Sequence, residues 1–144
     1  MRAKITAPKN TEALLKRMPI ELRGKQLKAA TRKAGAVVAV AARKRWRQTL
    51  PAAGYSGDKP GKIPLIKTIS TVTREKGSMV ASFTGPRWPE GAHGHLVEFG
   101  FIHVGGVRVE PKPALRPAGK ETRQKQQAAM ISALKKGLKE LARG

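Results

Sequence analysis

The sequence of 144 residues contains no cysteine, and aromatic residues make up only 4% of the chain. The lack of cysteine excludes disulfides, zinc–thiolate sites and a cysteine nucleophile. The scarcity of aromatics predicts an aliphatic core, which the hydrophobic content of 40% can supply. A chain of this length corresponds to one ordinary domain, so we expect residues 1–144 to fold as a single unit.

Long apolar runs are also missing. No run approaches the roughly 20 residues that a membrane-spanning helix requires, and the first ten residues, although basic, lack the apolar stretch of a secretory signal. The basic helical segments carry few bulky apolar anchors, which disfavours binding to a membrane surface. The expectation is a soluble protein of the cell interior.

Acidic residues are scarce too: 9 stand against 30 lysines and arginines, a net charge of +21. Residues 1–50 hold 14 basic and 2 acidic residues, residues 51–110 hold 7 and 5, and residues 111–144 hold 9 and 2. The two ends are therefore strongly basic and the centre is nearly neutral. Such a field attracts nucleic acid or acidic proteins over about a Debye length, roughly 10 Å. A solvated surface that keeps the protein soluble explains the charge equally well.

Helical patterns dominate the first 50 residues after a flexible arm at residues 1–9. Asn10 or Thr11 can cap a short helix, and Pro19 suits the first turn of a longer helix that reaches about Leu50. Residues 10–50 are thus expected to be helical.

Within the longer helix, residues 34–42 are small and apolar on every side, with Val37 and Val38 at the centre of this segment. Such a segment should be buried all round, in a core or between subunits. Gly35 lowers the helix propensity, so close packing is its expected compensation.

Residues 51–110 predict loops and a small sheet. The loop at 51–64 fails the pattern of a phosphate-binding loop in its glycine spacing. Alternating runs at 66–75 and 78–85 predict an antiparallel hairpin. Leu96–Phe99 suits a strand or a helical turn, and Phe101–Val109 is expected to complete the same sheet, with a bulge or turn at its two glycines.

Residues 111–144 begin with a proline-rich turn and continue as an amphipathic helical pattern from Pro117 to the C-terminus. The order of the segments predicts an α+β fold, in which a long N-terminal helix and a C-terminal helix pack on a small antiparallel sheet.

Patterns typical of enzymes do not occur. The single aspartate, Asp58, lies in a glycine–proline loop, and there is no nucleophile elbow or helical His–Glu zinc motif. The group His93, His95, Glu98 and His103 has the ligand types of a metal site, but solvent-exposed loop histidines explain it better. We therefore expect no catalysis, no metal and no cofactor.

A dense basic turn ends the long helix, and its members are the candidates for contact with DNA or with an acidic partner. The sequence contains no zinc finger, helix-turn-helix or aromatic RNA-binding signature, so such contact would be with the phosphate backbone. Trp46 could stack on a base among these cations, or it could pack against its own domain. The candidates are Arg43, Lys44, Arg45, Trp46 and Arg47.

The stretch from His95 to Ala118 resembles the small minor tail, or neck and tail-completion, proteins of long-tailed bacteriophages, a group that includes the tail-completion protein of lambda-like phages. The resemblance lies in the step Val-Glu-Phe-Gly at 97–100, and in the run Pro-Ala-Leu-Arg-Pro-Ala at 113–118 before a terminal helix. Phe101 stands where such proteins usually have threonine, and Ala114 where they usually have phenylalanine.

This resemblance implies a structural protein of the virion, assembled in the host cytoplasm, that joins the capsid connector to the tail. It implies a ring of copies, matched to the sixfold tail, and contacts with a head-closure (stopper) protein and with tail-terminator or tail-tube proteins. A basic accessory protein that binds nucleic acid without sequence preference is the alternative.

Physical roles follow for the residues of the resembling stretch. Phe99 and Leu115 are expected to anchor the last sheet segment in the core, and Gly100 to adopt a backbone conformation closed to other residues. Glu98 is expected to pair with Arg116 or with an arginine of a neighbour. The candidates for structural or interface roles are Val97, Glu98, Phe99, Gly100, Leu115, Arg116, Pro117, Val37 and Val38.

Overall fold

The structure is a computed structural model, and it describes residues 9–18, 20–50, 63–77 and 79–141. The predicted arm and the loop at 51–64, with its rejected phosphate-loop pattern, lie almost wholly outside these residues. The elements are α1 (Lys9–Lys16), α2 (Ile20–Thr49), α3 (Leu65–Thr68), β1 (Ile69–Lys76), β2 (Met79–Pro86), α4 (Gly94–Phe99), β3 (Phe101–Ile102), β4 (Arg108–Val109), α5 (Leu115–Glu121) and α6 (Arg123–Leu141).

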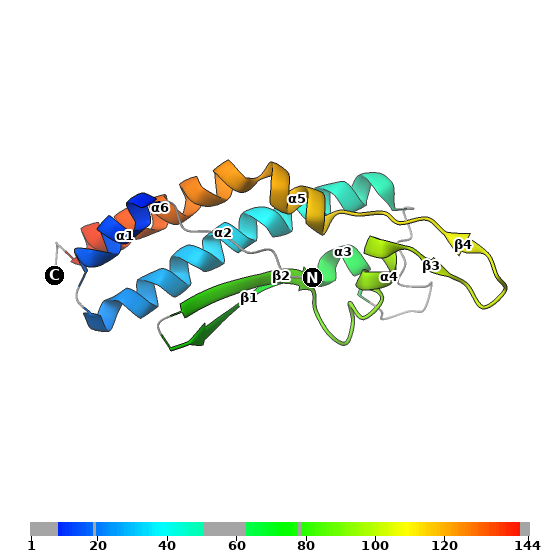
Figure 1. Cartoon of the computed structure of the whole chain (residues 1–144), viewed down its shortest axis with the longest axis horizontal. Helices are drawn as coiled ribbons and strands as arrows, with labels where there is room; N and C mark the ends of the chain where they lie inside the picture. Colours follow the sequence, from blue (N-terminus) through cyan, green and yellow to red (C-terminus); the bar gives the residue numbers. More distant parts are fainter. Residues whose placement is uncertain (1–8, 19, 51–62, 78, 142–144) are drawn as a thin grey trace.

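Helix α2 runs through the middle of the molecule. The hairpin of β1 and β2 packs on one side of α2, while α5 and α6 pack on the other side and α1 lies against α6 (Figure 1). The predicted α+β class, with long helices at both ends of the chain and a small antiparallel sheet, is confirmed. In the helices of the described ranges, none is long and apolar enough to cross a bilayer.

The predicted hairpin is present, with Ile69 opposite Pro86 at one end and Lys76 opposite Met79 at the turn. The strand begins three residues later than predicted, because residues 65–68 form the helical turn α3. There the hydroxyl of Thr68 donates to the carbonyl of Leu65 at 2.7 Å, a local bond that competes with strand pairing.

The expectation that residues 101–109 complete the same sheet is wrong. Strands β3 and β4 pair only with each other, Phe101 opposite Val109 and Ile102 opposite Arg108, and form a separate two-stranded ribbon. Leu96–Phe99 is helical, as part of α4, and Gly100 turns the chain away from the hairpin. The predicted turn at the two glycines lies at the tip of this ribbon.

The C-terminal helix is interrupted at Thr122, where the sequence predicts one continuous helix. The Thr122 hydroxyl donates to the carbonyl of Ala118 at 2.6 Å, and the side-chain amide of Gln126 donates to the carbonyl of Gly119 at 2.8 Å. Side chains thus donate hydrogen bonds to carbonyls near the end of α5, and α6 begins after the interruption.

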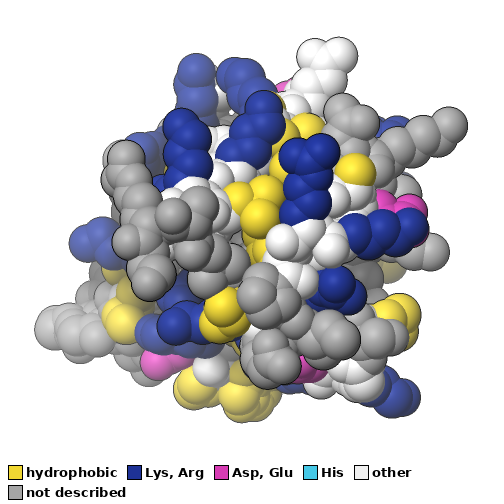
Figure 2. All heavy atoms as spheres, turned by 90° about the vertical axis from the view of Figure 1, so that its left-hand side faces the viewer, with side chains coloured by type: hydrophobic (Ala, Val, Ile, Leu, Met, Phe, Trp, Pro, Cys, Tyr) yellow, Lys and Arg dark blue, Asp and Glu magenta, His cyan; other side chains and the backbone are white. Residues whose placement is uncertain are grey.

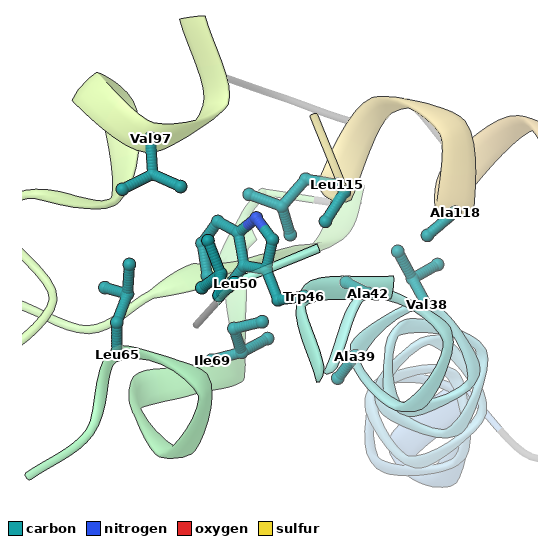
Figure 3. Close-up of a cluster of buried hydrophobic side chains, with 11 residues drawn as sticks. Val38, Ala39, Ala42, Trp46, Leu50, Leu65, Ile69, Val97, Leu115 and Ala118 are labelled. Atoms are coloured by element: carbon teal, nitrogen blue, oxygen red, sulfur yellow. The ribbon is translucent and has the colours of Figure 1, made fainter. Parts of the chain in front are cut away.

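Two buried clusters form the core along α2, one toward each end of the helix. One lies between α1, α2 and α6 and includes Met18, Ala30, Ala34, Met130 and Leu134. The other surrounds Trp46, which projects from α2 into the space between α3, α4 and α5 (Figure 3). The members of this second cluster are Val38, Ala39, Ala42, Trp46, Leu50, Leu65, Ile69, Val97, Ala114, Leu115 and Ala118.

The apolar segment at 34–42 is buried on two sides rather than all round. Val38 is buried and Val37 is partly buried, but Val40 is 63% exposed. The reason is geometric: the hairpin covers one side of α2 and α5–α6 cover the opposite side, which leaves a third side to solvent. The prediction that this segment is buried on every side within the core is therefore wrong, and its alternative, burial between subunits, stays a prediction.

Gly35 lies where α2 crosses the hairpin. A Cβ atom at this position would sit 2.5 Å from the Thr71 methyl carbon and 3.1 Å from the Thr84 hydroxyl oxygen. These two threonines face each other across the hairpin, their hydroxyls 3.0 Å apart, and Thr84 also donates to the Gly35 carbonyl at 3.1 Å. The close packing expected of Gly35 is confirmed.

Replacing Gly35 by alanine should lower the free energy of unfolding by about 1–3 kcal/mol, because the added methyl group forces apart a packed contact. Gly24 in the same helix is the matched control, since a Cβ there would make only an ordinary contact, 3.4 Å from a Glu75 carboxylate oxygen. Gly24→Ala should instead stabilise the protein by up to about 1 kcal/mol, through helix propensity. Urea denaturation of both variants measures the difference; two stabilised variants would contradict the close approach at Gly35.

Candidate interface site

The carboxylate of Glu98 accepts three hydrogen bonds from the start of α5. The donors are the backbone N–H groups of Ala114 at 2.8 Å, Leu115 at 3.1 Å and Arg116 at 3.0 Å. The first N–H groups of a helix have no partner within it, and the residue at the cap position, Ala114, has no side chain that could accept them. Glu98 supplies this cap from α4, and its negative charge also suits the helix dipole.

The predicted ion pair between the side chains of Glu98 and Arg116 is wrong. Arg116 contacts Glu98 through its backbone N–H, whereas its guanidinium lies over the ring of Phe99, 5.7 Å from the centroid. Glu98 is 97% buried, with both oxygens hydrogen bonded to the backbone. Its carboxylate is therefore closed to an arginine of a neighbouring molecule.

Leu115 is buried, as predicted, but the prediction that Phe99 anchors the core is wrong because its side chain is 54% exposed. Val97, two residues earlier in α4, is buried in the cluster around Trp46 instead. Residues two apart in a helix point about 200° apart, so only one of this pair can face the core. The ring of Phe99 consequently lies on the surface.

Gly100 has a φ of +74°, and a Cβ there would lie 2.7 Å from the Val109 carbonyl oxygen and 2.9 Å from the Pro111 nitrogen. Both facts confirm the expectation that this position requires glycine. The sequence predicts that Pro117 starts the last helix, but α5 begins two residues earlier, at Leu115. Pro117 still lies in the first turn, where its missing N–H costs no hydrogen bond.

Trp46 does not take part in any surface contact. Its side chain is fully buried, and its indole N–H donates to the Lys112 carbonyl at 3.0 Å. The proposal that Trp46 stacks on a base is therefore wrong, and its alternative, packing against its own domain, is confirmed. The ring fills the gap between α4 and α5, and its one polar group ties α2 to the proline-rich segment.

The other members of the basic turn divide into two groups. Arg43 donates to the Ile69 carbonyl and Arg45 pairs with Glu121 of α5, so both help to join α2 to its neighbours. Lys44 and Arg47 are exposed. The structure thus leaves these two cations of the predicted cluster as surface candidates for an acidic or nucleic-acid partner.

The histidines are not brought together around Glu98. His95 has its Nδ1 atom 2.7 Å from the Ala92 carbonyl, and the Nδ1 of His103 lies 3.4 Å from the Gly105 amide at the ribbon tip. Glu98 is committed to α5. The ranges that the structure describes contain no cluster of three or more metal-ligating side chains.

Two apolar surfaces meet at Phe99. The first is the arm, defined here as residues 101–109, on which Ile102, Val104 and Val107 are exposed. The second is the junction groove, a hollow of about 570 Å³ between the end of α4 and the start of α5. Its walls include Phe99, Pro111, Pro113, Arg116 and Pro117.

A further hollow of about 460 Å³ lies on the face of the hairpin that is turned away from α2. Val72 and Phe83, which face each other across the strands, line it together with Trp88 and the other side of Phe99. Val72 and Trp88 are both exposed. The site as a whole can therefore offer apolar contact area to a partner, because Glu98 and Trp46 make their hydrogen bonds to the backbone of their own chain.

Comparison with protein-family models, with curated proteins and with solved structures finds no match for this chain.

The sequence patterns did not predict the capping role of Glu98. A signal for it was available: α5 begins after Ala114, without serine, threonine, asparagine or aspartate at its cap position. A helix of this kind needs an acceptor from elsewhere in the chain. Glu98, the acidic residue of the Val-Glu-Phe-Gly step, was the candidate.

Glu98→Gln should lower the free energy of unfolding by about 1–3 kcal/mol, because the amide loses the charge and directs N–H groups toward backbone donors. Glu110→Gln is the control, because Glu110 is exposed and its Oε1 atom lies 3.2 Å from Nε of the equally exposed Arg108. Loss of this surface ion pair should change the free energy of unfolding by less than about 0.5 kcal/mol. Thermal unfolding of both variants, followed by circular dichroism, measures the two effects. Equal effects of both substitutions would rule out the capping role.

Proposed function

We propose that this protein is a structural subunit of the neck of a long-tailed bacteriophage, joining the capsid connector to the tail without catalysis. It acts as a ring of copies, with a head-closure (stopper) protein on one side and a tail-terminator or tail-tube protein on the other. Its place is the virion, and it assembles in the host cytoplasm.

The observation that carries this proposal is the hydrogen bonding of Glu98 to the start of α5. The resemblance to neck proteins rests on two short motifs, at 97–100 and 113–118, that are separated in the sequence. In the structure these motifs form one unit, in which a residue of the first caps the helix that begins in the second. Two motifs that make one packing unit support the resemblance more strongly than two unrelated stretches would.

The surface around this unit also supports the proposal. Phe99 forms a wall of both hollows, and three aliphatic side chains are exposed on the arm that follows it in the chain. Exposed apolar surface on a protein domain is characteristic of contact with other protein chains. A neck subunit needs several such contacts, because it touches its own copies and the proteins above and below it.

Binding to packaged DNA is a second candidate, and the charge distribution favours it. Among the glutamates whose side chains the structure describes, Glu98 caps α5 and each of the others lies near a lysine or arginine. With 30 cations and 9 acids in the chain, at least 21 cations have no acidic partner when pairs form one to one. Figure 2 shows lysines and arginines gathered on the end of the molecule where α1, the start of α2 and the end of α6 lie.

The two candidates make different predictions for the purified protein. As a neck subunit, it should form a stable complex with stopper and tail-terminator proteins of a long-tailed phage that carries this chain. Light scattering and negative-stain microscopy should then reveal rings. Failure to bind any neck or tail protein, under conditions in which the chain is folded, would contradict the proposed function.

If DNA contact is the main role, the isolated chain should bind duplex DNA of any sequence. The observed association constant should fall with salt at a slope of about −0.9 for each phosphate contacted. Gel-shift titrations at two salt concentrations measure this slope. If the chain binds DNA weakly and the association constant changes little with salt, DNA contact is contradicted. The excess positive charge would then face acidic protein neighbours.

A further inference from the structure

We propose that the arm of one copy inserts its apolar tip into the junction groove of a second copy, in a head-to-tail contact. This inference names the self-contact of the proposed ring and rests on that function for its biological meaning.

The arm makes few stabilising interactions within its own molecule. It contains only two cross-strand pairs, and an isolated two-stranded ribbon is at best marginally stable in water. Val104 at the tip is 102% exposed, and Ile102 and Val107 are exposed beside it. Aliphatic side chains at the end of a projecting ribbon gain from burial, and an occupied groove would supply the missing packing.

The junction groove matches this tip in size and character. Its volume of about 570 Å³ falls within the range of about 300–1,000 Å³ that is typical of ligand pockets, so it can hold several aliphatic side chains. Three prolines and the ring of Phe99 form apolar walls, and Arg116, Lys120 and Glu121 provide a polar rim. An apolar centre with a polar rim is the usual composition of a protein interface.

The walls of the groove are also held in place before anything binds. Glu98 fixes the start of α5 against α4, and the indole of Trp46 holds the Lys112 carbonyl between two of the prolines. A groove that is already formed loses little conformational entropy on binding.

The arm cannot fill the groove of its own molecule. Figure 1 shows the arm extending away from α4 and α5, and its base is held at Gly100 and Pro111, which lie beside the groove. The occupant must therefore come from another chain.

Charge indicates that this other chain is a second copy. Each copy carries +21, so two copies repel unless they meet through a neutral region. The arm and the residue after it contain one cation, Arg108, and one acid, Glu110, which pair at 3.2 Å. The arm is thus a neutral apolar projection on a strongly basic protein, as contact between identical chains requires.

A contact between two different surfaces of one chain is heterologous. Such contacts close into rings when the rotation between subunits permits, and otherwise extend as filaments. An arm-to-groove contact is therefore of the type that a ring needs, whereas a contact of the arm with itself would stop at a dimer.

The test uses the full chain and two variants, each defective in one partner surface. Val104→Lys places an ammonium group at the arm tip, and Phe99→Lys places one in the groove wall. Each should weaken self-association at least about a hundredfold, because an unpaired charge resists burial and the groove rim already carries the cations Arg116 and Lys120. Met79→Lys, at the exposed turn of the hairpin, is the matched control and should assemble like the unmodified chain.

Mixing the two defective variants gives the decisive measurement. The intact arm of Phe99→Lys can enter the intact groove of Val104→Lys, so an equal mixture should form a one-to-one dimer that cannot grow. Analytical ultracentrifugation should show monomers for each variant alone, the dimer for the mixture and larger assemblies for the unmodified chain. Circular dichroism of each variant checks that the fold is retained.

The inference is overturned if the unmodified chain stays monomeric up to high micromolar concentration, if Val104→Lys assembles normally, or if folded variants fail to combine on mixing. These outcomes are separable from failure of the proposed function. If the unmodified chain binds neck proteins without using its arm, the proposed function holds and the arm-to-groove contact is contradicted. If the chain assembles through its arm but binds no neck or tail protein, the arm-to-groove contact holds and the proposed function is contradicted.

Discussion

The hydrogen bonds from the start of α5 to the buried carboxylate of Glu98 join two parts of the chain that are 16 to 18 residues apart. Everything between these parts depends on that connection. The arm leaves from Gly100 and returns at Pro111, and the proline-rich segment then passes over Trp46 to reach α5. If Glu98 did not accept these N–H groups, α5 would start with unpaired buried donors, and the groove would lose one of its walls.

Trp46 performs the corresponding task on the other side of the same segment. Its ring fills the space between α2, α4 and α5, and its N–H binds a carbonyl of the proline-rich segment, which contains few donors for regular structure (Figure 3). In a core that is otherwise aliphatic, this one large side chain allows a long helix, a small hairpin and a short helix to share a single packed centre. The rigid base that results is what permits a thin arm to project from it.

The cations of the molecule and its apolar arm belong to different parts of the sequence. Cations concentrate in the two helical ends of the sequence, while the exposed aliphatic residues of the arm belong to the nearly neutral centre. This separation is consistent with the proposed neck subunit. Neutral apolar regions can bring identical chains together, and the basic helices remain for DNA or acidic neighbours.

Much of this protein follows from the sequence because it depends on local patterns. Helix periodicity, the turn of the hairpin, the glycine at 100 and the class of the fold are set by residues close in the chain, and these predictions are confirmed. The burial of Trp46, the exposure of Phe99 and Val40, the separate ribbon and the cap on α5 depend on which elements pack together. A tryptophan among cations, or a glutamate beside a phenylalanine, has the same local sequence whether its side chain is buried or exposed. Only the tertiary structure decides between them, because burial and hydrogen bonding of such residues are determined by neighbours that are distant in the sequence.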